Sequence, residues 1–85
     1  MTQDSAIKKY KRRKAALRQR IVDAGPDAAS VSLADKAAKL RSVRARPAER
    51  KLEHYRETLR GIEQRYGSSH LSELLREQLA RWPKQ

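Results

Sequence analysis

Three groups of side chains in this sequence have the chemistry of a functional site: a lone acid, two histidines and a block of cations. The acid, Asp35, lies in the alanine-rich segment 31–42. Burying a carboxylate among small apolar residues is costly unless a cation or a hydrogen-bonding partner compensates. Asp35 therefore either faces the interior and binds a cation, or forms an i,i+4 ion pair with Lys39, which stabilises a helix by only ~0.2–0.5 kcal/mol.

The two histidines, His54 and His70, lack the H-x-x-x-H spacing with which one helix face holds a metal. We expect both side chains to be exposed. The chain has no cysteine, which excludes disulfides, thiolate nucleophiles and cysteine-based zinc sites. Its three glycines are scattered, so no glycine-rich phosphate loop is present.

The cations are concentrated near the N-terminus. Residues 1–22 carry eight Lys or Arg and one acid, in a chain of formal net charge +11. The densest tract supplies the candidate nucleic-acid-binding residues Lys8, Lys9, Lys11, Arg12, Arg13 and Lys14. Such a block is either a solvated helix end or a surface that contacts the phosphates of an anionic partner.

The elements that must position these groups are predicted to be helices only. The chain of 85 residues has room for one small domain, 1–85. Apolar spacings of three and four residues predict an all-α bundle of about four helices, at about 5–22, 26–44, 47–66 and 69–82. Gly25-Pro26, Pro47 and Gly67 separate them, because glycine tolerates left-handed geometry and proline cannot continue a helix.

Local signals also predict how these helices begin and pack. We expect Asp4 or Ser5 to cap the first helix and Ser68 or Ser69 to cap the last. The second helix is apolar over a wide arc, so we place it at the centre of the fold. The short link near Gly67 predicts that the third and fourth helices form an antiparallel pair, with the leucines of the fourth in the core.

No apolar run approaches the ~20 residues that a bilayer span requires, and the first residues are too polar for a signal peptide. We therefore expect no membrane partner and, by default, a cytoplasmic location.

The segment around Asp35 resembles a known family. V-S-L-A-D-K-x-x-x-L-R-S, residues 31–42, is similar to the helix S-L-A-D-K-L-H-N-L-R-S of HD-domain metal-dependent phosphohydrolases. The nearest branch is that of the guanosine polyphosphate hydrolases of the RelA/SpoT type. The resemblance extends over roughly residues 10–82 and includes a K-x-x-x-Y pattern, Lys51 to Tyr55, so that the bundle resembles the C-terminal helices of an HD domain.

This resemblance implies that Asp35 is the last ligand of a divalent, manganese-type metal, with Lys36, Lys39 and Arg41 near phosphate. The family's other ligands, an upstream His and a His-Asp doublet, have no counterpart here. One carboxylate does not hold a hydrolytic metal, which needs several fixed ligands and an open position for water. We therefore expect a truncated or degenerate hydrolase, from a truncated or split reading frame. It would be inactive alone and would bind metal only if a complementary HD half supplied the missing ligands.

Two alternatives from other classes remain open. The first is a small basic helical protein that binds nucleic acid, or a nucleotide phosphate, through the N-terminal cations. The second is a helical protein-interaction module in which exposed parts of the second helix contact another chain or a second copy of this one.

Overall fold

The chain folds as an all-α bundle. A computed structural model describes residues 2–83 and contains four helices in this range and no strand. The helices are α1 (Thr2–Asp23), α2 (Pro26–Ser42), α3 (Glu49–Tyr66) and α4 (His70–Ala80). This arrangement confirms the predicted fold class.

The glycines and the proline described next separate the helices as the sequence predicts. Gly25 has a φ of 113° and directly precedes Pro26, the first residue of α2. Gly67, with a φ of 82°, ends α3. Ser69 then caps α4 in a capping box: its hydroxyl accepts from the Ser72 amide at 3.1 Å, and the Ser72 hydroxyl accepts from the Ser69 amide at 2.7 Å.

The helix ends differ from the predicted ends at several places. The α1 helix already includes Thr2, so Ser5 lies inside it and does not cap it, because no glycine or proline interrupts the first residues. The α2 helix ends at Ser42 rather than at residue 44. Carbonyls at this end of α2 find a partner just after α4: the Arg81 guanidinium donates to the carbonyls of Leu40 at 3.2 Å and of Val43 at 3.4 Å. The remaining differences are small, since α3 begins at Glu49 and α4 ends at Ala80.

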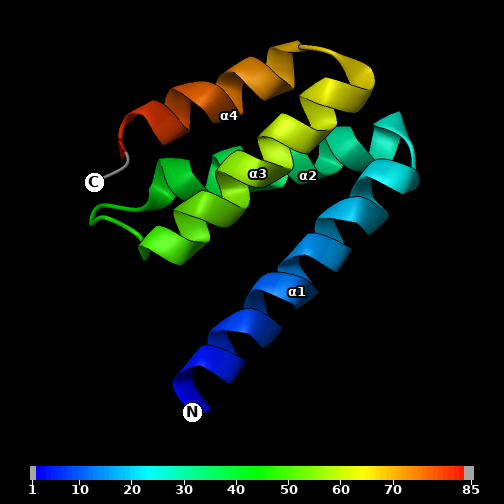
Figure 1. The fold of residues 1–85 in the computed structure, drawn as a ribbon. Helices are drawn as coiled ribbons and strands as arrows, with labels where there is room; N and C mark the ends of the chain where they lie inside the picture. Colours follow the sequence, from blue (N-terminus) through cyan, green and yellow to red (C-terminus); the bar gives the residue numbers. More distant parts are fainter. Residues whose placement is uncertain (1, 84–85) are drawn as a thin grey trace.

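The core lies where α2, α3 and α4 meet. Its largest fully buried side chains include Leu33 and Leu40 from α2, Leu52 from α3 and Leu75 from α4. The α2 and α3 helices each contact all three of the other helices, so the centre of the fold, predicted at α2, is shared by these two helices. The α4 helix contacts α3, as expected for consecutive helices, but its most extensive contact is with α2 (Figure 1).

The α1 helix lies along α3 and joins the core at its C-terminal end. Ile21 and Val22 pack against the core, and the Tyr66 hydroxyl donates a hydrogen bond to the Val22 carbonyl. Toward its N-terminus α1 extends away from the other helices (Figure 1). No helix in residues 2–83 is long and apolar enough to cross a membrane.

Candidate anion-binding site

Asp35 does not face the interior, and that prediction is wrong. Its side chain is 54% exposed, and its carboxylate lies 3.0 Å from the Lys39 ammonium, the i,i+4 ion pair that the sequence left as the alternative. The buried face of α2 is formed instead by Ala29, Leu33, Lys36 and Leu40. Among the described residues no three His, Cys, Asp or Glu side chains lie close enough together to hold a metal.

The three cations that the family resemblance placed near phosphate do not share one site. Lys36 is buried at the contact with α3, whereas Lys39 is exposed and bound to Asp35. Arg41 is also exposed, and at 100° per residue it lies about 140° around the helix from Lys36. A single ligand cannot reach all three side chains as they stand.

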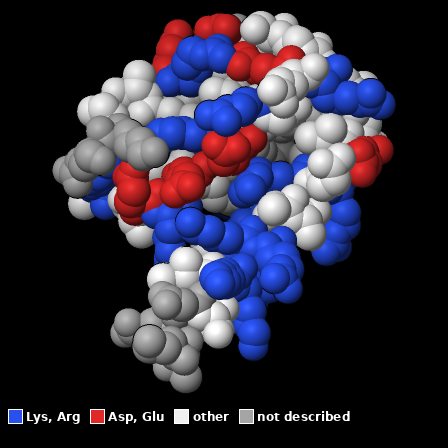
Figure 2. All heavy atoms as spheres, viewed as in Figure 1, with Lys and Arg blue, Asp and Glu red and all other residues white. Residues whose placement is uncertain are grey.

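The cations of α1 form the largest unbalanced charge in the structure. Lys8, Lys9, Lys11, Arg12 and Arg13 are all exposed, and Lys14 is half-buried. In the part of the chain that the structure describes, no cation of residues 8–20 has a carboxylate oxygen within 4.0 Å. Figure 2 shows Lys and Arg side chains gathered over the part of the molecule that α1 forms.

Two acids of α3, Glu49 and Glu63, are paired with arginines outside α1. Glu49 contacts Arg46 at 2.8 Å and Arg56 at 3.1 Å, and Glu63 pairs with Arg76 across α3 and α4. These arginines hold the pKa values of Glu49 and Glu63 below the ordinary range, chiefly through hydrogen bonds to the carboxylates. These two acids therefore stabilise the body of the bundle and do not pair with the cations of α1.

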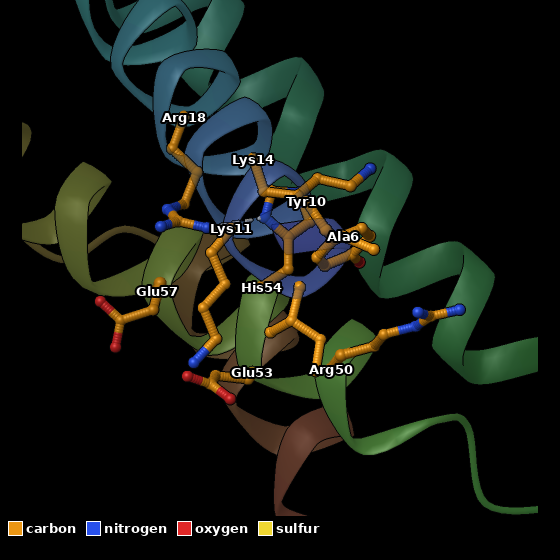
Figure 3. Close-up of a pocket in the computed structure, with 10 residues that line it drawn as sticks. Ala6, Tyr10, Lys11, Lys14, Arg18, Arg50, Glu53, His54 and Glu57 are labelled. Atoms are coloured by element: carbon orange, nitrogen blue, oxygen red, sulfur yellow. Dashed lines mark hydrogen bonds between the residues drawn. The ribbon is translucent and has the colours of Figure 1, made fainter. Parts of the chain in front are cut away.

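A groove of about 560 Å³ lies between α1 and α3. Tyr10, Lys11, Lys14 and Arg18 line it from α1 (Figure 3). Ile7 also lines it. The α3 wall carries Arg50, Glu53, His54 and Glu57. In Figure 3, Lys14 and Arg50 lie on either side of the Tyr10 ring, whereas the Arg18 side chain lies further along α1, against His54.

His54 is buried at this contact, which corrects the prediction that it is exposed. Only 6% of the residue is accessible, and its Nδ1 accepts a hydrogen bond from the Arg18 guanidinium at 3.0 Å. Loss of hydration lowers the pKa of His54 to about 4, and the nearby charges of Lys36, Arg18 and Lys14 act in the same direction. The imidazole is thus neutral at pH 7, with its proton on Nε2. His70, in contrast, is exposed as predicted.

Lys36 is the buried cation of the site. The residue is 9% exposed, and its ammonium donates to the Ser32 hydroxyl at 3.1 Å and lies 5.4 Å from the centre of the Tyr55 ring. Desolvation lowers the pKa of Lys36, while the charge of Asp35 partly opposes this effect. Because the Lys36 ammonium is poorly hydrated in this position, binding of an anion beside it is favourable.

Sequence reasoning missed several residues that the fold brings to this site. Arg18 lies four residues after Lys14 and eight after Tyr10, so the helical spacing could have identified it as part of the same face. Nothing in the sequence links α1 to Arg50 or His54. Comparison of the chain with protein-family models, with curated proteins and with solved structures finds no match.

Proposed function

We propose that the protein binds nucleic acid through the phosphate backbone, with α1 as the contact element. The observation that carries this proposal is the set of exposed α1 cations with no carboxylate partner among the described residues. Nucleic-acid phosphates release condensed counterions when Lys and Arg neutralise them, and this release dominates non-specific affinity. An extended helix bearing unpaired cations is suited to that mode of binding.

The shape of α1 favours a duplex over a stacked single strand. The cations of residues 8–20 extend along about 18 Å of helix, a length over which duplex DNA presents about ten phosphates. Single-strand binding relies on exposed aromatic faces on which bases stack. The aromatic residue of α1, Tyr10, instead carries the Lys14 ammonium at 5.5 Å and the Arg50 guanidinium at 5.1 Å from its ring centre.

A salt titration tests this function. With about five phosphates contacted, the logarithm of the binding constant for a labelled 20-base-pair duplex should fall against the logarithm of salt concentration with a slope of about −4 to −5. Fluorescence anisotropy between 50 and 200 mM salt measures this slope. Absence of binding at 50 mM salt would contradict the proposal.

A second candidate function rests on the outer face of α2. Val31 is 69% exposed, and Ala34 and Ala38 are exposed on the same side of the helix as Asp35. An exposed apolar stripe beside an acid is the surface that a complementary HD half would cover, as the similarity of residues 31–42 to HD-type phosphohydrolases implies. In this function the chain docks onto a partner that carries the missing His and His-Asp ligands.

The test of docking is reconstitution. The partner would be an HD-type guanosine polyphosphate hydrolase truncated before its S-L-A-D-K helix, mixed with this chain, manganese and guanosine tetraphosphate. We expect a one-to-one complex in sedimentation and no hydrolysis by this chain alone. The variant Val31→Arg should abolish the complex, whereas Arg65→Gln on α3 should retain it. A mixture that sediments as two separate species would exclude docking.

A further inference from the structure

Two tyrosines at the junction of α1, α2 and α3 hold four cations against their ring faces. The Lys14 ammonium and the Arg50 guanidinium lie 5.5 and 5.1 Å from the centre of the Tyr10 ring. The ammonium groups of Lys36 and Lys51 lie 5.4 and 5.9 Å from the centre of the Tyr55 ring. The tyrosine–cation cluster is defined by these residues: Tyr10, Lys14, Lys36, Arg50, Lys51 and Tyr55.

The charge of the tyrosine–cation cluster is not balanced by acids. Among the described residues, none of its four cations has a carboxylate oxygen within 4.0 Å. The acid that acts on Lys36, Asp35, is bound to Lys39 at 3.0 Å. Glu53 and Glu57 line the adjoining groove, where Glu57 pairs with Arg60 at 3.5 Å. Cation–π contacts offset part of the mutual repulsion of these cations.

Lys36 is the most buried cation of the cluster. Its ammonium group has three donors, and within the described residues one of them reaches an acceptor, the Ser32 hydroxyl. The residue is nine-tenths buried, so water reaches the remaining donors poorly. A buried ammonium with free donors, beside three further cations, is suited to an oxygen-rich anion.

We propose that the tyrosine–cation cluster binds a phosphate monoester. At pH 7 a monoester carries a charge of about −1.5 to −2 and has three terminal acceptor oxygens. A backbone diester carries a single charge, so a cluster of four cations on two neighbouring tyrosines favours the monoester. The two ligands that offer this group are the terminal phosphate of a nucleic acid and a mononucleotide. This site goes beyond the proposed backbone contact, which uses the outer face of α1.

The adjoining groove has room for the rest of such a ligand. Its volume of about 560 Å³ lies within the range of small-molecule pockets, about 300–1,000 Å³. Lys14 and Arg50 border it on the two sides of Tyr10 (Figure 3). Arg50 offers the planar donor pair that binds phosphate in a bidentate manner, whereas Lys14 and Lys36 act as point charges.

Calorimetry with small ligands at constant ionic strength tests the site. We expect adenosine monophosphate and inorganic phosphate to bind and adenosine to give no heat. Arg50→Gln, an exposed position that leaves the core intact, should weaken monophosphate binding about tenfold, and Lys36→Met at least as much. The matched control is Arg65→Gln, which removes an exposed arginine lying 5.8 Å from the Tyr66 ring and should change the affinity less than twofold.

Duplexes with a 5′-phosphate or a 5′-hydroxyl identify the source of the ligand and separate this inference from the proposed function. A preference of about fivefold or more for the 5′-phosphate, lost in Arg50→Gln, supports a nucleic-acid end. Monophosphate binding without that preference supports a mononucleotide. If both duplexes bind equally and neither inorganic phosphate nor the monophosphate binds, the site is refuted while the backbone contact stands. If neither duplex binds at 50 mM salt but the monophosphate does, the backbone contact is refuted and the site stands.

Discussion

Replacing Lys9, Arg12 and Arg13 with glutamine should weaken duplex binding by at least about tenfold at 100 mM salt. These three residues are exposed and have no carboxylate within 4.0 Å in the described residues, so each is free to neutralise a phosphate. Each lost phosphate contact removes about 0.9 from the magnitude of the salt slope. The triple variant should therefore show a slope shallower by about 2 to 3, measured by anisotropy on the same labelled duplex.

The matched control removes the same charge from other elements. Arg41, Arg44 and Arg65 are exposed, lie outside α1 and make no ion pair among the described residues. Their replacement with glutamine should weaken binding much less than the α1 triple variant does. An equal loss of affinity in the two variants would show that net charge alone, rather than the α1 surface, governs binding.

Acidification from pH 7 to pH 4 should destabilise the protein through His54. Burial and the neighbouring cations lower the pKa of His54 to about 4 in the folded state, whereas an unfolded histidine titrates near 6.5. Below pH 6.5 the unfolded chain binds a proton that the folded chain excludes, so this contribution to stability decreases as the pH falls and is lost near pH 4. At about 1.4 kcal/mol per pKa unit, the free energy of unfolding decreases by up to about 3 kcal/mol.

Urea denaturation at a series of pH values measures this dependence, and His54→Gln is the control. Glutamine is able to accept from Arg18 through its amide oxygen but does not titrate, so the variant should lose the His54 contribution between pH 6.5 and 4, whatever its stability at pH 7. The hydrogen bond from Arg76 lowers the pKa of Glu63, and those from Arg46 and Arg56 lower that of Glu49. An unchanged pH dependence in His54→Gln would contradict the assignment.

The helices were predictable from the sequence because their limits depend on local chemistry. Pro26, Gly67 and Ser69 act through φ preference and hydrogen bonding over a few residues. The C-terminus of α2 was not predictable to the residue. It ends where Arg81, far along the chain, reaches the carbonyls of Leu40 and Val43, and such a contact exists only after α4 has packed.

The exposure of Asp35 was mispredicted because α2 is apolar over too wide an arc. With alanines on most sides, its sequence does not identify which face the other helices cover. The structure covers the face of Leu33 and Leu40 and leaves Val31, Ala34 and Ala38 outside. The alanines that surround Asp35 in the sequence therefore did not show that its carboxylate is buried.

The burial of His54 and the tyrosine–cation cluster depend on tertiary packing. Lys51 and Tyr55 share a face at i,i+4, as do Tyr10 and Lys14, and these pairs are visible in the sequence. The meeting of Tyr10 with Arg50, and of Arg18 with His54, requires α1 to lie along α3. An exposed charged helix and one that a second helix partly covers have the same local sequence pattern. Only the tertiary structure distinguishes them.

The central claim is that nucleic acid contacts α1, and nuclear magnetic resonance tests it most directly. Uniformly ¹⁵N-labelled protein would be titrated with an unlabelled 20-base-pair duplex at 50 mM salt. The account predicts that the largest amide shift changes fall in residues 8–20 and at the α1-facing residues of α3, with α4 almost unaffected. Shift changes centred on α4, or spread evenly over all four helices, would contradict it.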